Sequence, residues 1–407
     1  MSPLLRKRSA GKKQTIALLD IGSGSVGAAL VEIGRGAGEA PAILAVKRLA
    51  LRTAYGRNAL QLQAHTLRAA REALAAMQAH TRHRNVQHLA IFLPAPWSTL
   101  NLHTVRFSQS SAFLADHKLL QRMITQHVQQ EQRAELENQE HGQNRDPVFE
   151  RTVTGIKLNG YLAPASPADT EVFTIELMLA SARAPQEFLA AIQDVADEFF
   201  SEVTFHSSLL AAAHALSAVL AVSQTDAAEA PFLLCDGEGE IAELMVVKDG
   251  IPEAHAAIPV GYGTIVRTLA SHAGLSHEEI PSALALAQDP RSLLAGYAKE
   301  AIALAQKECA EALGNAEPIC ASSTPRRGFI IGDGPEAQWF AAAVVESPRL
   351  RAALPKDFAA EVLTAKSIGS HVAYQTGRAK GDVMLGLEAL FAADRFGNPD
   401  VQNFYVA

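Results

Sequence analysis

An aspartate at the end of an apolar run, followed at once by glycines and serines, is a pattern that can hold phosphate and a metal ion. Near the start of the chain, Asp20 closes the apolar run 15–19 and precedes a short turn rich in glycine and serine. Amides of such a turn can cup phosphate oxygens, and the carboxylate can hold Mg²⁺ through water. We therefore predict a nucleotide-phosphate site made of Asp20, Gly22, Ser23, Gly24 and Ser25.

The same glycines allow a second interpretation. Gly22, Gly24 and Gly27 satisfy the GxGxxG spacing of dinucleotide-binding folds. In those folds the glycine turn opens a helix, whose N-terminal amides hold the pyrophosphate. Here the apolar, β-rich residues 26–33 favour a returning strand, so a phosphate-binding hairpin is the preferred interpretation. A nicotinamide-dependent oxidoreductase and a plain β-turn remain the alternatives.

A second aspartate-glycine turn lies in the other half of the chain. Asp236 ends an apolar run and is followed by Gly237 and Gly239, then by a predicted strand over 241–248. The dipeptide Asp249-Gly250 is a hairpin-turn signal that leads into a further strand. The two halves therefore begin alike, and two facing hairpins could clamp one nucleotide.

The elements around these turns indicate an α/β protein with two similar halves and an inserted unit. Helical spacing of apolar residues over 67–77 leads into a predicted strand at 86–93. From residue 98 the composition changes, with a long polar helix at 116–143 and a turn signal at Asn159-Gly160. We expect a basic disordered tail at 1–14, a first half at 15–97 and 186–225, an inserted subdomain at 98–185, and a second half at 226–407.

Composition and charge argue against several classes of protein. Of the 407 residues, 48% are hydrophobic and 19% are charged, a balance that supports packed cores. A net charge of −7 gives no overall field to attract nucleic acid, although the N-terminal tail is basic. Three cysteines without a CxxC pair indicate neither a disulfide framework nor a cysteine-rich zinc site.

Targeting signals are also missing from the sequence. The basic N-terminus lacks the apolar stretch of a signal peptide. Residues 203–225 carry no Asp, Glu, Lys or Arg before the loop that follows, but they include histidines and serines. We predict that this stretch is a buried core helix rather than a membrane span. We expect a cytoplasmic protein. A peripheral position at the inner face of the cell membrane is compatible with this expectation.

The motifs resemble those of the actin-like ATPase superfamily, most closely its cell-division family FtsA, with the pilus-assembly family PilM as a near relative. The first phosphate motif of the superfamily resembles residues 20–31, and the second, usually DIGGxTT(D/E), aligns with residues 236–243. A later pattern, dG…iPvGg, is similar to residues 249–263, and the adenosine-site glycines resemble residues 331–334. The inserted unit also sits where the FtsA family carries a small α/β subdomain.

The resemblance implies an actin-like (ribonuclease H-like) fold in which two duplicated halves enclose a nucleotide cleft. It implies ATP as ligand, Mg²⁺ held through water by Asp20 and Asp236, and Asp236 as the catalytic residue that orients metal or water. It implies self-association through the inserted subdomain and contact with the tubulin-like division protein FtsZ. FtsA proteins usually end in an amphipathic membrane helix, which residues 398–407 do not resemble, so we expect no anchor of that kind. The other cofactor-binding residues it implies are Gly22, Ser23, Gly24, Ser25, Gly237, Gly239, Gly261, Gly332 and Gly334.

Several positions depart from the superfamily pattern in ways that affect catalysis. Where the second motif normally has a glycine and two hydroxyl residues, this chain has Glu238, Ile241 and Ala242, so a phosphate loses hydroxyl donors and meets an extra carboxylate. Ser207 and Ser208 stand where the superfamily places an acid or amide that orients water. We therefore predict a scaffold that binds ATP with weak or no hydrolysis. A PilM-like pilus scaffold and an active ATPase are the alternatives.

Overall fold

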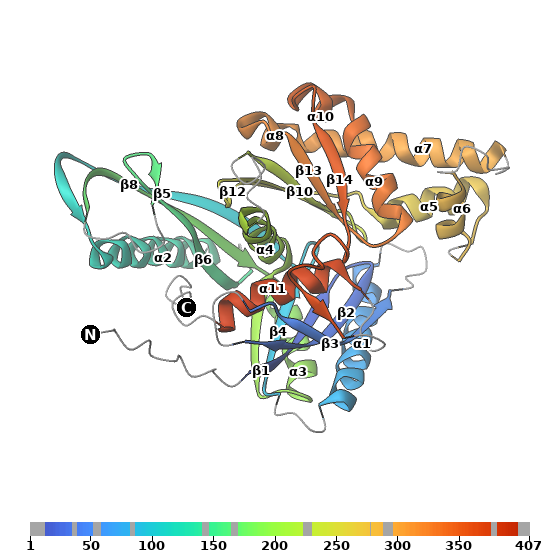
Figure 1. Ribbon diagram of the computed structural model, residues 1–407, viewed down its shortest axis with the longest axis horizontal. Coiled ribbons are helices and arrows are strands. Elements are labelled where there is room, and N and C mark those ends of the chain that lie inside the picture. Colours follow the sequence, from blue (N-terminus) through green and yellow to red (C-terminus); the bar gives the residue numbers. More distant parts are fainter. Residues whose placement is uncertain are drawn as a thin grey trace, which may run out of the picture.

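The computed structural model describes residues 13–34, 39–51, 58–81, 86–140, 146–163, 170–222, 230–276, 278–287, 296–375 and 381–397. The predicted tail before residue 13 and the C-terminal residues 398–407 lie outside the described residues. Three β-sheets and their helices form two halves, with an inserted unit that projects to one side (Figure 1). Among the described helices, none combines the length and hydropathy that a membrane span needs.

The first sheet has six strands in the order β15-β3-β2-β1-β4-β9. β1, β2 and β3 form an antiparallel meander, whereas β4 runs parallel to β1 and β9 runs parallel to β4. Alternate side chains of β1 pack into two different cores, which explains its continuous apolar run. The strands are β1 Gln14–Ile21, β2 Ser25–Ile33, β3 Ala42–Ala50, β4 His88–Leu93, β9 Glu202–Ser207 and β15 Ala373–Tyr374.

The second sheet repeats this arrangement, with the order β12-β11-β10-β13-β14. Its first three strands are again antiparallel, and two parallel strands follow on the other side of β10. The same order and sense occur in β3-β2-β1-β4-β9, so the predicted duplication is confirmed. The strands are β10 Phe232–Asp236, β11 Ala242–Lys248, β12 Ile251–Ile258, β13 Arg327–Ile331 and β14 Ala359–Leu363.

The inserted unit enters the chain after β4 and is a four-stranded sheet in the order β5-β8-β6-β7. Helix α2 (His117–Glu140) packs on it through Leu120 and Met123, which share a small core with Ile156 and Val172. The Asn159-Gly160 turn joins β6 to β7 with both residues at positive φ, as the turn signal predicts. The strands are β5 Thr99–Ala115, β6 Val148–Leu158, β7 Tyr161–Leu162 and β8 Thr170–Arg183.

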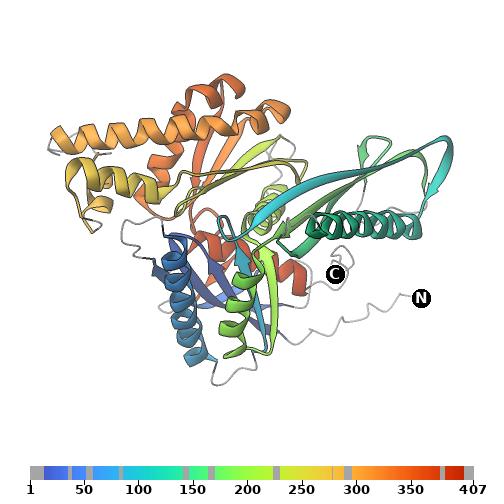
Figure 2. The same cartoon turned by 180° about the vertical axis from the view of Figure 1, so that it is seen from behind.

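The helices cover both outer faces and separate the two main sheets. α1 (Ala59–His80) and α3 (Gln186–Asp197) lie on the outer face of the first sheet (Figure 2). α4 (Ser208–Val222) and α11 (Val383–Gly397) lie between the sheets and share one core with both. The outer core of the second half includes side chains of α5 Tyr262–Ala273, α6 Ile280–Ala287, α7 Gly296–Leu313, α8 Glu317–Ser323, α9 Pro335–Glu346 and α10 Pro348–Ala353.

Two expectations about the chain course need correction. The stretch 203–225 is not one helix: it starts as the strand β9 and turns into α4 at Ser208, because Val203 and Phe205 pack against the first sheet. The sequence also predicts that the second half runs from 226 to the C-terminus at 407. Instead, β15 pairs with β3, and α11 packs against α4 and β2.

Candidate functional site

The two predicted hairpin turns face each other at the carboxyl ends of β1 and β10. Gly27 lies in β2, which returns alongside β1, so the glycine pattern belongs to a hairpin and not to a dinucleotide-binding helix. The Glu240 amide donates a hydrogen bond of 2.9 Å to Ser23 Oγ across the cleft. A Cβ placed on Gly24 would lie 3.0 Å from the Gly239 Cα, so the two backbones touch. The predicted pair of hairpins therefore meets directly.

Arg48, which the sequence did not single out, occupies the centre of this cleft. It lies on β3 directly opposite Gly27 in the strand register. Its guanidinium donates to Asp20 Oδ2 at 2.9 Å and to Ser25 Oγ at 2.7 Å. It also binds both oxygens of Asp382, at 2.5 and 3.0 Å. The position where the sequence places a metal ion thus has a protein cation beside it.

Glycine at position 27 is explained by this arginine. A Cβ on Gly27 would lie 2.7 Å from Arg48 Nη2, closer than Cβ contacts in proteins come. The third glycine of the GxGxxG pattern therefore makes room for the Arg48 side chain. Its presence is explained without a bound pyrophosphate.

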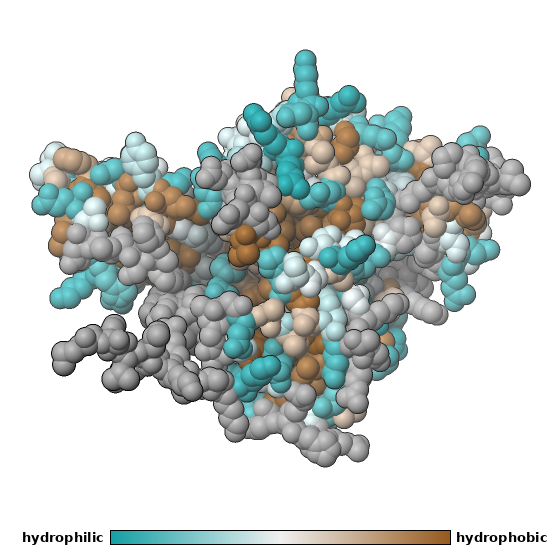
Figure 3. Space-filling model, in the orientation of Figure 1, coloured by the Kyte–Doolittle hydropathy of each residue, from teal (hydrophilic) through white to brown (hydrophobic). Residues whose placement is uncertain are grey.

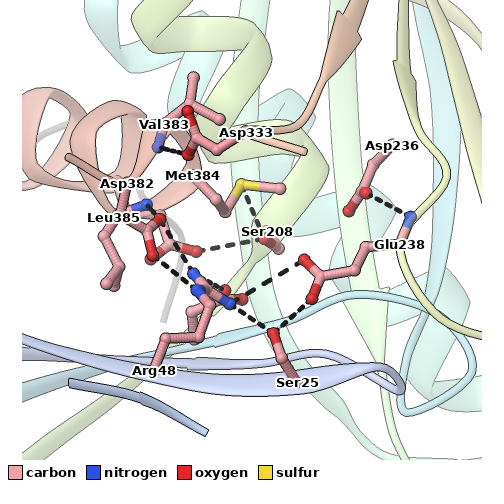
Figure 4. Close-up of polar contacts among 12 residues, drawn as sticks. Ser25, Arg48, Ser208, Asp236, Glu238, Asp333, Asp382, Val383, Met384 and Leu385 are labelled. Atoms are coloured by element: carbon pink, nitrogen blue, oxygen red, sulfur yellow. Dashed lines mark hydrogen bonds and ion pairs between the residues drawn. The ribbon is translucent and has the colours of Figure 1, made fainter. Parts of the chain in front are cut away.

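Glu238 brings a carboxylate from the second hairpin to the first (Figure 4). Its Oε1 accepts a short hydrogen bond from Ser25 Oγ, and its Oε2 lies 3.9 Å from Arg48 Nη1. Its backbone amide donates to Asp236 Oδ1 at 3.0 Å. The side chain of Glu238 is 43% exposed, so it reaches the cleft from the solvent side.

Buried carboxyl groups surround the arginine. Burial raises the pKa of Asp20 to about 7, against the opposing effect of Arg48 and with a further rise from Glu238 and Asp382. Burial, and after it the charge of Glu238, raises the pKa of Asp236 well above its usual range. Burial does the same to the pKa of Glu388 on α11, whose Oε1 accepts from Ser208 Oγ at 3.2 Å. These groups bind protons more tightly than exposed acids do.

The glycines predicted at the adenosine side pack against other parts of the chain. A Cβ on Gly332 would lie 2.6 Å from the Ala337 Cβ, and one on Gly334 would lie within 2.3 Å of the Glu336 carboxyl carbon. Between them, Asp333 accepts backbone amides of Ala365 at 3.0 Å and Val383 at 2.6 Å. Asp333 thus fixes the start of α11 beside the end of β13.

The other second-half glycines also have intramolecular contacts. A Cβ on Gly237 would lie 2.9 Å from the Phe340 ring, and one on Gly261 would lie 2.5 Å from the Gly239 carbonyl oxygen. Gly239 has a φ of +89°, which glycine adopts readily. The structure thus brings the predicted residues of both hairpins together, with Gly261 against the second turn and Gly332 and Gly334 on the neighbouring strand end.

Mg²⁺ and ATP do not fit these residues as their side chains lie. The Asp20 carboxylate is bound by Arg48, and the Asp236 carboxylate accepts the amide of Glu238. Phosphates between the turns would meet the Glu238 carboxylate and the contact of Gly24 with Gly239. Within the described ranges, no group of three or more histidine, cysteine or acidic side chains is arranged to hold a metal ion. Entry of the nucleotide requires Glu238 and Arg48 to move.

A second hollow lies where the inserted unit meets both halves. Its volume is about 350 Å³, and β6 and α4 form much of its wall. Phe391 and the Asp249-Gly250 turn complete it, and the pair His214–Asp394, with 2.9 Å between Nε2 and Oδ2, stands at one side. The lining is mostly apolar.

The comparisons with known proteins place the fold. No protein-family model matches the chain, and no curated protein matches it. Among solved structures, the chain is similar to one described as a PilM-PilN type IV pilus biogenesis complex, with 18% identity and a TM-score of 0.61 over 94% of this chain and 99% of that chain. This likeness shows the actin-like (ribonuclease H-like) α/β fold that we predicted.

Weaker similarities to solved structures include those to EutJ and to an exopolyphosphatase. EutJ from Carboxydothermus hydrogenoformans has 11% identity and a TM-score of 0.42, over 94% of this chain and 89% of that chain. An exopolyphosphatase from Cytophaga hutchinsonii has 10% identity and a TM-score of 0.39, over 79% of this chain and 67% of that chain. Neither bears on the function of this chain, and these similarities do not show membership of the FtsA family.

Proposed function

We propose that this chain is an actin-fold scaffold that works by assembling with other proteins and hydrolyses ATP weakly or not at all. The observation that carries this proposal is the position of Glu238 at the tip of the second hairpin, against Ser25 and Arg48. Phosphoryl transfer needs groups that stabilise negative charge around the transferred phosphate. A carboxylate at that place has the opposite effect.

One of the two serines at the water-orienting position is engaged elsewhere. Ser208 donates its hydroxyl to Glu388 Oε1 at 3.2 Å. Ala242 is buried at the start of β11 and offers no hydroxyl. Asp236 remains the proposed catalytic residue, but burial raises the pKa of its carboxyl group and so favours the protonated form.

ATP with Mg²⁺ is a proposed ligand that has to compete with side chains of the chain itself. We propose that binding displaces Glu238 from Ser25 and frees Asp20 from Arg48. Asp20 and Asp236 would then reach the metal ion through water, which shields phosphate charge when it is bound. The other proposed contacts are Gly22, Ser23, Gly24, Ser25, Gly237, Gly239, Gly261, Gly332 and Gly334.

Two kinds of partner are proposed. The presence of the inserted unit does not decide between them. An FtsA-like scaffold would bind an FtsZ-like division protein and self-associate, at the inner face of the cell membrane. A PilM-like scaffold would bind pilus machinery, and the solved structure in complex with PilN matches 94% of this chain, a share that reaches beyond the two halves. Capture of an FtsZ tail peptide would support the first assignment, and capture of a PilN-type segment would support the second.

The enzymatic part of the proposal is tested by phosphate release. The purified chain should release little phosphate from Mg-ATP, and Asp236→Ala should change that low rate little. Each missing transition-state donor can lower a rate by about 10²–10³. Vigorous magnesium-dependent hydrolysis that Asp236→Ala abolishes would show an active ATPase instead.

A further inference from the structure

We propose that Arg48 and Glu238 are built-in substitutes for the metal ion and the phosphate, and that they hold the two halves closed without any ligand. The residues concerned, which we call the cleft network, are Asp20, Ser25, Arg48, Glu238 and Asp382. This inference depends neither on the partner of the scaffold nor on its rate of ATP hydrolysis.

The charge in the cleft network is the first argument. Arg48 lies beside Asp20, the carboxylate for which a hydrated metal ion is expected, and its Nη2 is 2.9 Å from Asp20 Oδ2. It is also held by both oxygens of Asp382, the residue before α11. A guanidinium stays charged at any physiological pH, so it supplies a permanent positive charge at this place. Arg48 therefore takes the place beside Asp20 that a hydrated metal ion would occupy.

The anion in the cleft network is the second argument. Ser25 is a predicted phosphate ligand of the first hairpin, and its hydroxyl donates to Glu238 instead. The same Ser25 oxygen accepts from Arg48 at 2.7 Å. A serine hydroxyl and a guanidinium that both face a carboxylate of the opposite hairpin form a small anion site, which the chain fills by itself.

The fit between the two turns is the third argument. The Glu240 amide bonds to Ser23, and the backbones of Gly24 and Gly239 are in contact. In turn, the Gly261 backbone packs against the Gly239 carbonyl. These contacts leave the tips of the hairpins no room for phosphate groups, so the closed arrangement and a bound triphosphate exclude each other.

In a nucleotide-dependent protein of this shape, the ligand would join the halves, and its loss would let them separate. Here residues of the chain itself make the contacts that join the halves. We infer that the closed arrangement is its resting state and that ATP, where it binds, opens or distorts the cleft network.

Hydrogen exchange of the Glu240 amide tests this directly, because that amide is the donor of the bond between the hairpins. In the ligand-free full chain it should exchange slowly. Glu238→Ala should speed its exchange at least threefold, and Arg48→Met should speed it as well, since that change removes the cation 3.9 Å from Glu238 Oε2. The control is Glu361→Ala, which removes a glutamate–arginine pair of 2.8 Å to Arg327 on the surface of the second half and should leave the Glu240 amide unchanged.

A second arm uses Mg-ATP as the probe. Wild-type chain should show no added protection of the Glu240 amide with Mg-ATP, whereas Glu238→Ala should bind Mg-ATP at least tenfold more tightly than wild type. Fast exchange in the ligand-free wild type, followed by protection when Mg-ATP is added, would overturn the inference. Unchanged exchange in Glu238→Ala would overturn it as well, even if Arg48→Met fails to fold. Phosphate release bears only on the proposed scaffold function, so the two failures are distinguishable.

Discussion

At the scale of single residues, Arg48 changes the meaning of a motif that the sequence shows clearly. The sequence identifies Asp20 and the glycine turn, and the structure puts them at the hairpin tip. It does not identify Arg48, because 42–50 was not recognised as a strand: its Lys and Arg interrupt the apolar pattern. The one usable signal was that position 48 pairs with Gly27, which can be seen only once β2 and β3 are aligned.

The contact of Arg48 with Gly27 gives a prediction about stability. Gly27→Ala puts a methyl group 2.7 Å from the guanidinium, so the arginine must leave Asp20 or the strands must separate. Overpacking of this kind typically lowers the free energy of unfolding by about 1–3 kcal/mol. Chemical denaturation measures the change. Gly369→Ala is the matched control, since its Cβ would meet nothing closer than 3.3 Å, and an equal loss there would contradict the explanation.

The raised pKa of Asp20 gives a prediction about pH. An acid whose pKa is higher in the folded chain than in the unfolded chain stabilises the fold most at low pH, because folding favours its protonated form. This contribution is present below the usual value of 3.8 and is lost as the pH rises to about 7. The difference in unfolding free energy between wild type and Asp20→Asn should therefore fall over this range.

The slope is bounded by one proton, which is about 1.4 kcal/mol for each pH unit. Urea denaturation at several pH values measures it, and the exposed Asp357→Asn serves as the control for a carboxylate outside the cleft. A difference that rises with pH would mean that Arg48, and not burial, determines the ionisation of Asp20.

At the scale of elements, short sequence patterns predict the elements that depend on neighbouring residues alone. The two hairpins, the turns at 159–160 and 249–250 and the polar helix α2 follow from apolar spacing and turn residues. β5 was missed because it is an edge strand whose side chains are mostly exposed polar groups. The place of α11 was missed because it depends on packing with α4, far away in sequence. Asp382 and Glu388 come with it, so they were missed too.

The inserted unit gives a prediction about assembly. Four large apolar side chains are exposed on it: Leu114 at 47%, Tyr161 at 79%, Leu162 at 49% and Phe173 at 53%. Hydrophobic side chains are visible on the surface of this unit in Figure 3. Exposed apolar groups gathered on one small unit suit a protein contact. We expect self-association through this unit, as proposed for the scaffold.

Phe173→Ser should therefore weaken self-association of the full chain, with the sedimentation coefficient at a given concentration shifting toward that of the monomer. Leu60→Ser is the control, because Leu60 is 76% exposed on α1, outside the inserted unit. An equal shift in both variants, or none in Phe173→Ser, would mean that the exposed apolar groups of the inserted unit do not carry the contact.

At the scale of the whole molecule, the duplicated sheets bring two weakly similar hairpins to one cleft. We propose a division that follows the sheets: a first half at 13–97, 186–222 and 364–397, the inserted unit at 98–185, and a second half at 230–363. In this division the chain crosses between the halves near α4 and again before β15. The second crossing lies close to the cleft network, because Asp333 binds the backbone amides of both Ala365 and Val383, the residue after Asp382.

The central claim is that the chain itself fills its nucleotide cleft, and a calorimetric titration of Mg-ATP into the purified full chain tests it most directly. The account predicts a dissociation constant of about 1 mM or weaker, equivalent to a binding free energy no better than about −4.1 kcal/mol, and tighter binding once Glu238 is replaced by alanine. Binding of Mg-ATP to the unmodified chain with a constant of about 1 μM, unaltered in Glu238→Ala, would contradict it.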